Sequence, residues 1–500
     1  MRDPAKHLTK GVAIYGAGDA LTAVINFVLL SVYVKFDILT PVDYGALALI
    51  LSAETFAKVI SRWGLDGAFM RFYYEREDGA PRRSMTSTIV WFMFVTNAVL
   101  LALALAGSGW VAARLALDPK YLTALRLMFV NIALIAFTFV PLHAMRMRKQ
   151  AAVYSAFTFA RSAGQIVLRV VLVIGLRLGV TGLYLTDLIL TVVLLAFMWP
   201  WLRPLVAWTF SRDELRQSLR FALPRLPAGL ASQALDSTPK IILGQFFPKA
   251  AVGVYQNGTT LGTGVAFFKS AFETAWAPFY YETSRKPDAK AVFSKMATYG
   301  AAVIVLLVAG TAAIARDAIL VVLRPEYLDA VPVVPLIAIA IGLQGIYQLT
   351  SIGLNLTSRT EFYSVSTITA AIVGIASGVW LIPRHGVVGA AITVLLAYAL
   401  QAIMAFALAQ RFYPVTYETG RLVRVCVAGI AAAAIAVWLP SMPALAGLLV
   451  RGTTTVVMYV LILALTGFFR PTERAFVREI VGRAKRRRAT AAGPSAIDVR

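Results

Sequence analysis

The chain has 500 residues, of which 59% are hydrophobic and only 15% charged, and its formal net charge is +23. A soluble domain carries roughly 25% charged residues, so a soluble enzyme or binding module is excluded. The single cysteine, Cys426, excludes an internal disulfide, and the three histidines, His7, His143 and His385, are too far apart to predict a zinc site. We expect an integral membrane protein without a cofactor.

Apolar runs recur along the chain, and each approaches the roughly 20 residues that a membrane-spanning helix needs. The runs are continuous and rich in Leu, Ala and Val, which favours helices over the alternating strands of a membrane barrel. The predicted fold class is therefore all-α, with about 14 transmembrane helices. The predicted spans are 11–34, 43–66, 87–108, 122–143, 153–176, 179–199, 220–247, 252–275, 297–315, 330–354, 363–383, 386–409, 422–439 and 444–468.

Three short motifs occur twice, in the same order and 206 or 207 positions apart. Such a spacing predicts two homologous halves, each with six spans, followed by two further helices. Because six spans return the chain to the same side of the membrane, the two halves form a parallel repeat. The motif pairs are Phe72–Glu75 with Phe279–Glu282, Pro119–Ala124 with Pro325–Ala330, and Gly179–Gly182 with Gly386–Gly389.

The distribution of charge predicts the orientation and the domain limits. Most Lys and Arg residues lie in the gaps that share a side with both termini, so we expect both termini in the cytoplasm. The predicted divisions are an N-lobe (1–205), a C-lobe (206–415), two extra helices (416–470) and a basic cytoplasmic tail (471–500). Anionic lipid headgroups explain the positive charge better than nucleic acid does.

Charged residues inside predicted spans are costly in lipid and are therefore candidates for function. Glu54, Lys58, Arg62 and Asp66 are four residues apart, which predicts one helical face. Arg62 and Asp66 recur 207 positions later as Lys269 and Glu273. These groups either form structural salt bridges and extend to the interface, or line a watery cavity between the lobes.

The cavity interpretation yields two sets of candidates. Since basic residues slightly outnumber acidic ones, the cavity suits an anionic head group such as phosphate, which guanidinium binds in a bidentate manner. The candidates for substrate binding are Arg62, Lys269, Lys58, Arg161, Arg169, Arg225 and Lys240, and those for ion coupling or orientation are Asp19, Glu54, Asp66, Asp236 and Glu273.

Several stretches resemble one known family. Residues 234–244, followed by Val252–Tyr255, are similar to the seventh-to-eighth span signature of polysaccharide-biosynthesis flippases. In that family an Arg usually follows the Asp, whereas here Lys240 is the nearest positive charge to Asp236. Asp43–Gly45, Pro325–Ala330 and Tyr413–Glu418 resemble further family elements before spans two, ten and thirteen. The family belongs to the multidrug/oligosaccharidyl-lipid/polysaccharide (MOP) exporter superfamily.

The resemblance implies a flippase rather than an enzyme. Such a protein moves an undecaprenyl-diphosphate-linked oligosaccharide to the outer leaflet of the bacterial cytoplasmic membrane, for export of lipopolysaccharide or exopolysaccharide. Its expected partners are the lipid-linked oligosaccharide, membrane lipids, a polysaccharide polymerase and glycosyltransferases, and no nucleic acid. One alternative is an ion-coupled multidrug exporter of the same superfamily. Another, a membrane glycan polymerase, is disfavoured by the short outer gaps at 108–121 and 316–329.

Overall fold

The computed structural model describes residues 29, 31–148, 150–266, 269, 276 and 279–470, and every structural statement below concerns these residues. Helices make up the described chain, and these residues contain no strand. Ten of the helices are long and apolar enough to cross a membrane. The structure therefore confirms the all-α, polytopic class, whereas it does not confirm the count of 14. The predicted tail, 471–500, and most of the first predicted span lie outside the described residues.

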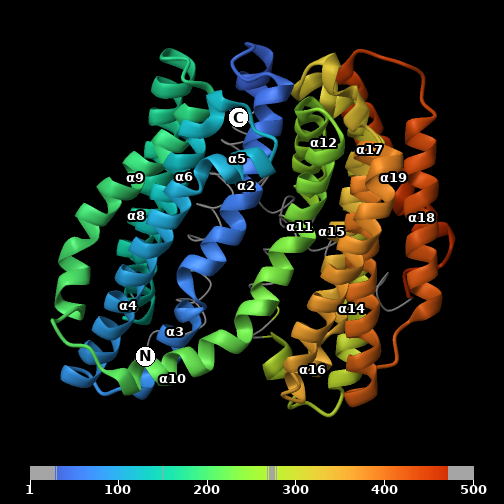
Figure 1. The fold of residues 1–500 in the computed structure, drawn as a ribbon. Helices are drawn as coiled ribbons and strands as arrows, with labels where there is room; N and C mark the ends of the chain where they lie inside the picture. The colour runs from blue at the N-terminus through green and yellow to red at the C-terminus, as the bar shows by residue number, and fades with distance from the viewer. Residues whose placement is uncertain are drawn as a thin grey trace, which may run out of the picture.

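The first half forms one bundle (Figure 1). Proline or a 3₁₀ turn begins several of its helices, as expected where the first backbone N–H groups have no partner. The elements are α2 (Pro41–Arg62), α3 (Leu65–Glu75), α4 (Ala80–Ala106), α5 (Ser108–Arg114), η1 (Pro119–Tyr121), α6 (Leu122–Ile135), α7 (Phe139–Met147), α8 (Ala151–Arg169), η3 (Val170–Gly175, a π-helix) and α9 (Gly179–Leu202).

The second half lies beside the first, and the last two helices flank it on the far side (Figure 1). Its elements are α10 (Arg212–Ala222), η5 (Leu223–Arg225), α11 (Leu226–Phe246), α12 (Lys249–Gly262), α14 (Ala289–Val322), η7 (Pro325–Ala330), α15 (Val333–Thr350), α16 (Ile352–Leu356), α17 (Glu361–Phe412), α18 (Thr419–Val437) and α19 (Ala444–Leu465). We call the end with α5 and the start of α12 the upper end, and the end with α10 and α16 the lower end.

The 52-residue helix α17 is in fact a hairpin of two helical arms. The backbone of Gly386 has φ 54° and ψ −130°, a conformation that ends a helix. Nε2 of Gln401 donates a hydrogen bond of 2.8 Å to Oγ1 of Thr367, whereas a straight helix would hold these residues about 50 Å apart. The two arms correspond to the predicted spans 363–383 and 386–409.

The backbone repeats where the sequence repeats. Gly179 and Gly386, equivalent in the two halves, have φ values of 55° and 54°. Each turn lets the chain reverse at the upper end, and only glycine adopts such a conformation at little cost. The motif that occurs at Pro119–Ala124 and again at Pro325–Ala330 forms the 3₁₀ helices η1 and η7. Tyr121 and Tyr327 in these helices are buried. These matched elements support the parallel repeat of two six-helix lobes.

The second predicted span is broken rather than continuous. Helix α2 ends at Arg62 because Trp63 and Gly64 adopt left-handed conformations, with φ values of 53° and 69°. Asp66 therefore lies on a separate helix, α3. The prediction that Asp66 shares one continuous helical face with the three charged residues before it is wrong, since the break changes the helical register.

The two halves meet most closely where α2 crosses α12. A Cβ atom on Gly45 would lie 1.9 Å from the carbonyl oxygen of Lys249, and one on Gly253 would lie 2.0 Å from that of Pro41. Real Cβ atoms essentially never approach this closely, so glycine is needed on both helices. The crossing lies near the start of each helix and brings the two halves together at the upper end.

The connection between the halves is attached to the first half. Nε of Arg76, just after α3, donates to Glu214 on α10 at 3.0 Å, and Nη2 adds a second bond of 3.2 Å. Backbone N–H groups of Ala207 and Ser211 donate to side-chain hydroxyls on α4, at 2.7 and 3.0 Å. Helix α10 lies beyond the predicted boundary at residue 205 and still packs against α3 and α4.

Candidate functional site

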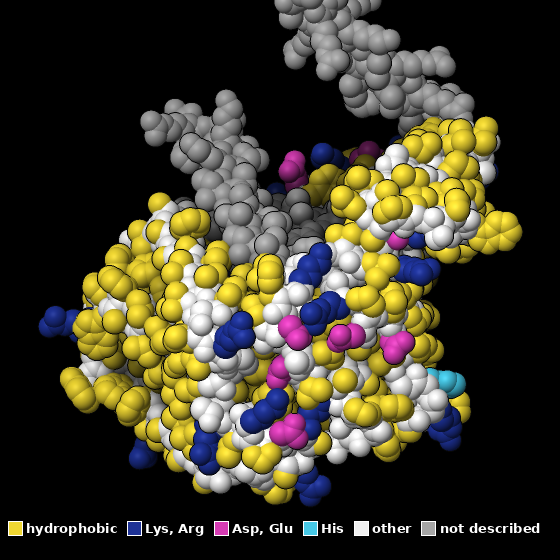
Figure 2. Space-filling model, turned by 90° about the horizontal axis from the view of Figure 1, so that it is seen from above, with side chains coloured by type: hydrophobic (Ala, Val, Ile, Leu, Met, Phe, Trp, Pro, Cys, Tyr) yellow, Lys and Arg dark blue, Asp and Glu magenta, His cyan; other side chains and the backbone are white. Residues whose placement is uncertain are grey.

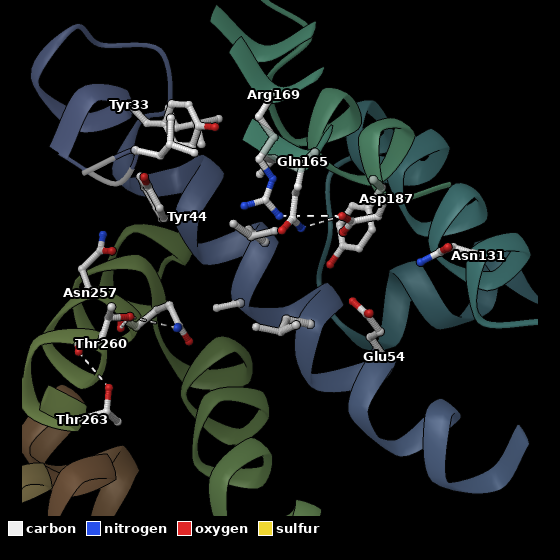
Figure 3. A pocket seen from close by; sticks show the side chains of 18 of the residues that line it. Tyr33, Tyr44, Glu54, Asn131, Gln165, Arg169, Asp187, Asn257, Thr260 and Thr263 are labelled. Carbon is white, nitrogen blue, oxygen red and sulfur yellow. Dashed lines mark hydrogen bonds and ion pairs between the residues drawn. The ribbon is translucent and has the colours of Figure 1, made fainter. Parts of the chain in front are cut away.

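A cavity of about 620 Å³ lies between the two halves (Figure 3). Helices α2, α6, α8 and α9 of the first half line most of it, and α12 of the second half forms the opposite wall. Its polar lining residues are Tyr33, Tyr44, Glu54, Lys58, Asn131, Arg161, Gln165, Arg169, Tyr184, Asp187, Gln256, Asn257, Thr260 and Thr263. We call it the central cavity.

The first-half wall of the central cavity carries charge. Gln165 donates a hydrogen bond of 2.9 Å to Oδ1 of Asp187, and Nη2 of Arg169 lies 3.8 Å from the same oxygen. Figure 3 shows these three side chains together on one side of the cavity. The spacing of four along α8 brings Gln165 and Arg169 to one helical face, as the sequence predicts. Arg161, four residues earlier, also lines the cavity.

Helix α2 adds an ion pair to the same cavity. Nζ of Lys58 lies 2.5 Å from Oε1 of Glu54, one turn earlier on the helix. Glu54 is buried and only 5% exposed. The cavity lining thus contains three basic side chains, of which two are arginines, against the carboxylates of Glu54 and Asp187. The excess of positive charge favours an anionic occupant.

A second cavity, of about 430 Å³, lies lower between the halves. It is lined by Arg62 at the end of α2, Asp66 on α3 and Arg225 in η5. Lys58 lines both cavities. The guanidinium of Arg225 lies over the ring of Phe221, 3.9 Å from its centroid. We call this space the lower cavity, and its charged lining is also basic on balance.

Two candidates on α11 belong to another environment. The hydroxyl of Tyr398 on α17 donates a hydrogen bond of 2.6 Å to Oδ1 of Asp236. Lys240 lies one turn further along α11, as the sequence spacing predicts. The contact joins α11 to α17 within the second half, so Asp236 and Lys240 are separate from the arginines that line the central cavity.

The two basic residues of the repeated charge pair, Arg62 and Lys269, have different surroundings. Arg62 lines the lower cavity, whereas Nζ of Lys269 donates to Oε1 of Gln344 on α15. Asp19 and Glu273 lie outside the described residues. The predicted pairing of Arg62 with Lys269 in one cavity stays a prediction.

Sequence reasoning missed the uncharged wall of the central cavity. Gln256, Thr260 and Thr263 follow one another at spacings of four and three, which predicts one face of a helix. Asn257 lies beside this stripe. A polar stripe on an otherwise apolar span is the signal in the sequence that marks this wall. Asp187 on α9, which is not among the candidates above, also lines the cavity.

Charged residues form two ion pairs at the upper end. Nζ of Lys249, at the start of α12, lies 3.2 Å from Oδ1 of Asp118, just before η1. Nη1 of Arg324, just before η7, lies 2.9 Å from Oδ1 of Asp37. Both ion pairs join one half to the other. Figure 2, which views this end, shows acidic and basic side chains interspersed near its middle.

Comparison with known proteins identifies a family for this chain. A family model described as "Polysaccharide biosynthesis protein" matches residues 37–332, which is more than half of the chain. The chain belongs to the polysaccharide biosynthesis protein family. A comparison with curated proteins finds no match.

Several solved structures share the fold of this polysaccharide biosynthesis protein. "Lipid II flippase MurJ, inward closed conformation" aligns with a TM-score of 0.65 at 11% identity, covering 94% of this chain and 100% of that chain. An inward-facing multidrug resistance MATE family transporter of the MOP superfamily aligns at 0.61 and 15% identity, covering 81% and 95%. A MOP superfamily transporter from Pyrococcus furiosus, whose structure is described as having a binding pocket of reverse polarity, aligns at 0.51 and 14% identity, covering 85% and 97%.

Proposed function

We propose that this family member is a flippase that carries a polyprenyl-diphosphate-linked oligosaccharide from the cytoplasmic to the outer leaflet of a bacterial membrane. The observation that carries the proposal is the central cavity, which lies between two homologous halves and has a basic excess in its lining. A sugar chain and a diphosphate are poorly soluble in about 30 Å of hydrocarbon. A polar cavity between the halves supplies the hydrogen bonds and counter-charge that they lose on leaving water.

The arginines of the central cavity would bind the diphosphate. Guanidinium groups donate paired hydrogen bonds to phosphate oxygens, and they stay charged even when partly buried. Arg161 and Arg169 project from one face of α8, and Lys58 faces the same space from α2. Glu54 and Asp187 hold Lys58 and Arg169 in place through the contacts described above. The polyprenyl tail would stay in the bilayer, outside the cavity.

The lower cavity would be the route of entry. Arg62 and Arg225 lie on its walls, and Lys58 connects it with the central cavity. If the positive-inside prediction holds, the lower end faces the cytoplasm, and a lipid-linked anion meets these cations first. The ion pairs at the upper end then close the outer side, and their rupture belongs to the step that releases substrate outward.

Reconstituted protein tests this proposal. Proteoliposomes would contain a polyprenyl-diphosphate-linked oligosaccharide, and the fraction that becomes accessible to an externally added, impermeant glycosidase would be measured. Wild-type protein should equilibrate the lipid between leaflets, and Arg161→Ala with Arg169→Ala should slow this by at least about tenfold, because each charge-assisted contact contributes about 1.5–3 kcal/mol.

A matched control is Arg359→Ala, because Arg359 is an exposed arginine that pairs with Glu361 away from both cavities. The control should transport at the wild-type rate. Lys269→Ala, measured in the same assay, tests the prediction that Lys269 binds substrate as the counterpart of Arg62. Transport by the Arg161/Arg169 variant at the wild-type rate would refute the proposal.

The alternative, export of cationic drugs, shares the fold. It is disfavoured because a basic cavity repels a cation. Loss of surface polysaccharide without increased sensitivity to cationic dyes, in cells that lack the protein, is the result expected of a flippase. Increased dye sensitivity with intact polysaccharide would favour the drug exporter.

A further inference from the structure

The two walls of the central cavity differ in chemistry. The first-half wall carries Lys58, Arg161 and Arg169, whereas α12 and the 3₁₀ turn that follows it contribute two amides and two hydroxyls. Figure 3 shows Asn257, Thr260 and Thr263 on the side of the cavity away from Arg169, Gln165 and Asp187. The uncharged wall offers groups that both donate and accept hydrogen bonds, whereas a phosphate needs only donors and counter-charge.

Several polar atoms on this side have no partner. Among the described residues, Oε1 of Gln256 and the hydroxyls of Tyr33 and Tyr44 are buried and make no hydrogen bond, whereas the Asn257 side chain interacts with the hydroxyl of Tyr327. Asn257 is only 1% exposed, and Tyr33 and Tyr44 are 5% and 4% exposed. More than nine in ten buried polar groups in proteins are paired, because each unpaired group costs about 1–3 kcal/mol. Three such atoms around one cavity indicate that a ligand or water satisfies them.

The pattern matches what binds a sugar. A sugar ring offers several neutral hydroxyls that both donate and accept, and amide side chains provide both functions at one position. Tyrosine rings offer flat apolar surfaces with a polar tip, which suit the C–H faces of a sugar. Tyr44 faces the cavity above Asn257 in Figure 3. Neutral groups also avoid competing with the arginines for the diphosphate.

We propose that the α12 wall, with Asn257 and Gln256 as its central residues and Tyr44 above them, is a sugar-binding subsite. It would hold the sugar residue next to the diphosphate while the arginines opposite hold the phosphates. The inference rests on the proposed flippase function and adds to it the residues that distinguish a glycosylated carrier from a bare one. Asn257 and Gln256 would be specificity residues, and the arginines would supply affinity common to all carriers.

Binding measurements on the full-length protein in lipid nanodiscs test the subsite. The probes are undecaprenyl diphosphate and three derivatives that carry one glucose, galactose or N-acetylglucosamine. Wild-type protein should bind at least one sugar-bearing probe about tenfold or more tightly than the bare diphosphate, as two or three hydrogen bonds of about 1 kcal/mol each would give.

The decisive variant is Asn257→Leu with Gln256→Met, which keeps side-chain volume and removes the hydrogen-bonding groups. It should reduce the preference for sugar to less than about twofold and leave the Kd for undecaprenyl diphosphate within about twofold of wild type. Arg161→Gln should weaken all four probes in proportion. Thr260→Val is a second, milder variant, whose hydroxyl already bonds to the backbone of Gln256 at 2.9 Å.

The unfolding temperature distinguishes a binding role of these side chains from a structural role. Because Oε1 of Gln256 is buried without a partner, Gln256→Met should leave the unfolding temperature unchanged or raise it. A lower unfolding temperature for Gln256→Met and for Thr260→Val would mark the wall as structural and overturn the inference.

The outcomes separate this inference from the proposed function. If wild-type protein binds all four probes equally, the flippase proposal stands and the sugar subsite is refuted. Equal weakening of every probe in the Asn257/Gln256 variant also refutes the subsite, because the effect is then general. If wild-type protein binds none of the probes, the proposed function fails and the subsite with it.

Discussion

Asp118 and Lys249, which are 131 residues apart, form an ion pair of 3.2 Å between the two halves of the molecule. Asp118 immediately precedes Pro119, and Arg324 immediately precedes the equivalent Pro325. Arg324 also forms a pair with the other half, through Asp37. Equivalent positions of the repeat thus carry opposite charges and make corresponding contacts across the upper end, where the halves must separate if the cavity is to open there.

The first prediction concerns opening of the upper end. In a Cys426→Ser background, a cysteine at Thr260 reports access to the central cavity through labelling by an impermeant maleimide. Asp118→Ala should accelerate labelling from the upper side by up to about fivefold, since a partly exposed pair contributes at most about 1 kcal/mol. The exchanged pair Asp118→Lys with Lys249→Asp should restore slow labelling.

Lys120→Ala is the matched control for this experiment. Lys120 lies at the same end and pairs with Asp43 of its own half at 3.4 Å. Its loss removes one charge from the same end, of the sign that Lys249 carries, without removing a contact between the halves. Faster labelling in the Lys120 variant, to the degree seen for Asp118→Ala, would show that the pairs do not hold the halves together.

The second prediction concerns the crossing of α2 and α12. Gly45→Ala should lower the free energy of unfolding by about 1–3 kcal/mol, because its Cβ would collide with the backbone oxygen of Lys249, which cannot rotate away. Gly310→Ala on α14 is the control, since no atom lies within 4 Å of its new Cβ. The control should gain up to about 1 kcal/mol of helix propensity. Thermal unfolding in detergent measures both, and a stabilised Gly45→Ala would contradict the close crossing.

The third prediction concerns the attachment of the last two helices. Nη1 of Arg451 on α19 donates to Oδ2 of Asp317 on α14 at 2.8 Å, and both residues are buried. Asp317→Ala should destabilise the protein by about 3–5 kcal/mol, because the arginine is left buried and uncompensated. Replacement of both residues, by Asp317→Leu and Arg451→Met, should cost less than the single change.

An exposed ion pair provides the comparison for Asp317. Arg71 and Glu75 lie one turn apart on α3, with side chains 52% and 47% exposed. Glu75→Ala should change the stability by less than about 1 kcal/mol. If Asp317→Ala unfolds at the same temperature as Glu75→Ala, the buried pair does not attach α19 to α14.

The fourth prediction concerns the balance of charge in the central cavity. Asp187→Asn removes the carboxylate that lies 3.8 Å from Arg169, and it keeps an oxygen that can accept the hydrogen bond from Gln165. Undecaprenyl diphosphate should then bind several-fold more tightly, because the excess of positive charge grows by one. Asp213→Asn makes the same change of net charge on the exposed surface of α10 and should leave the Kd unchanged. Equal effects of both would indicate general electrostatics rather than a local site.

The sequence alone was sufficient for the all-α, membrane-spanning class, because the length and composition of an apolar run are local properties. A span of apolar residues has no other stable place than lipid, and Gly179 and Gly386 mark the same chain reversal in both halves. The spacing of Glu54 and Lys58 also predicted correctly that they share a helical face, since the period of a helix decides it.

What the sequence did not determine depends on how helices meet. The left-handed residues Trp63 and Gly64 divide a predicted span, so that Asp66 reaches the lower cavity from a second helix. The polar face of α12 carries no charge, and only its position opposite Arg161 and Arg169 identifies it as part of the site. Helical period places a side chain on one face of its own helix, whereas contacts between residues more than a hundred positions apart arise from packing. Tertiary structure alone decided which charges share a cavity and which join the halves.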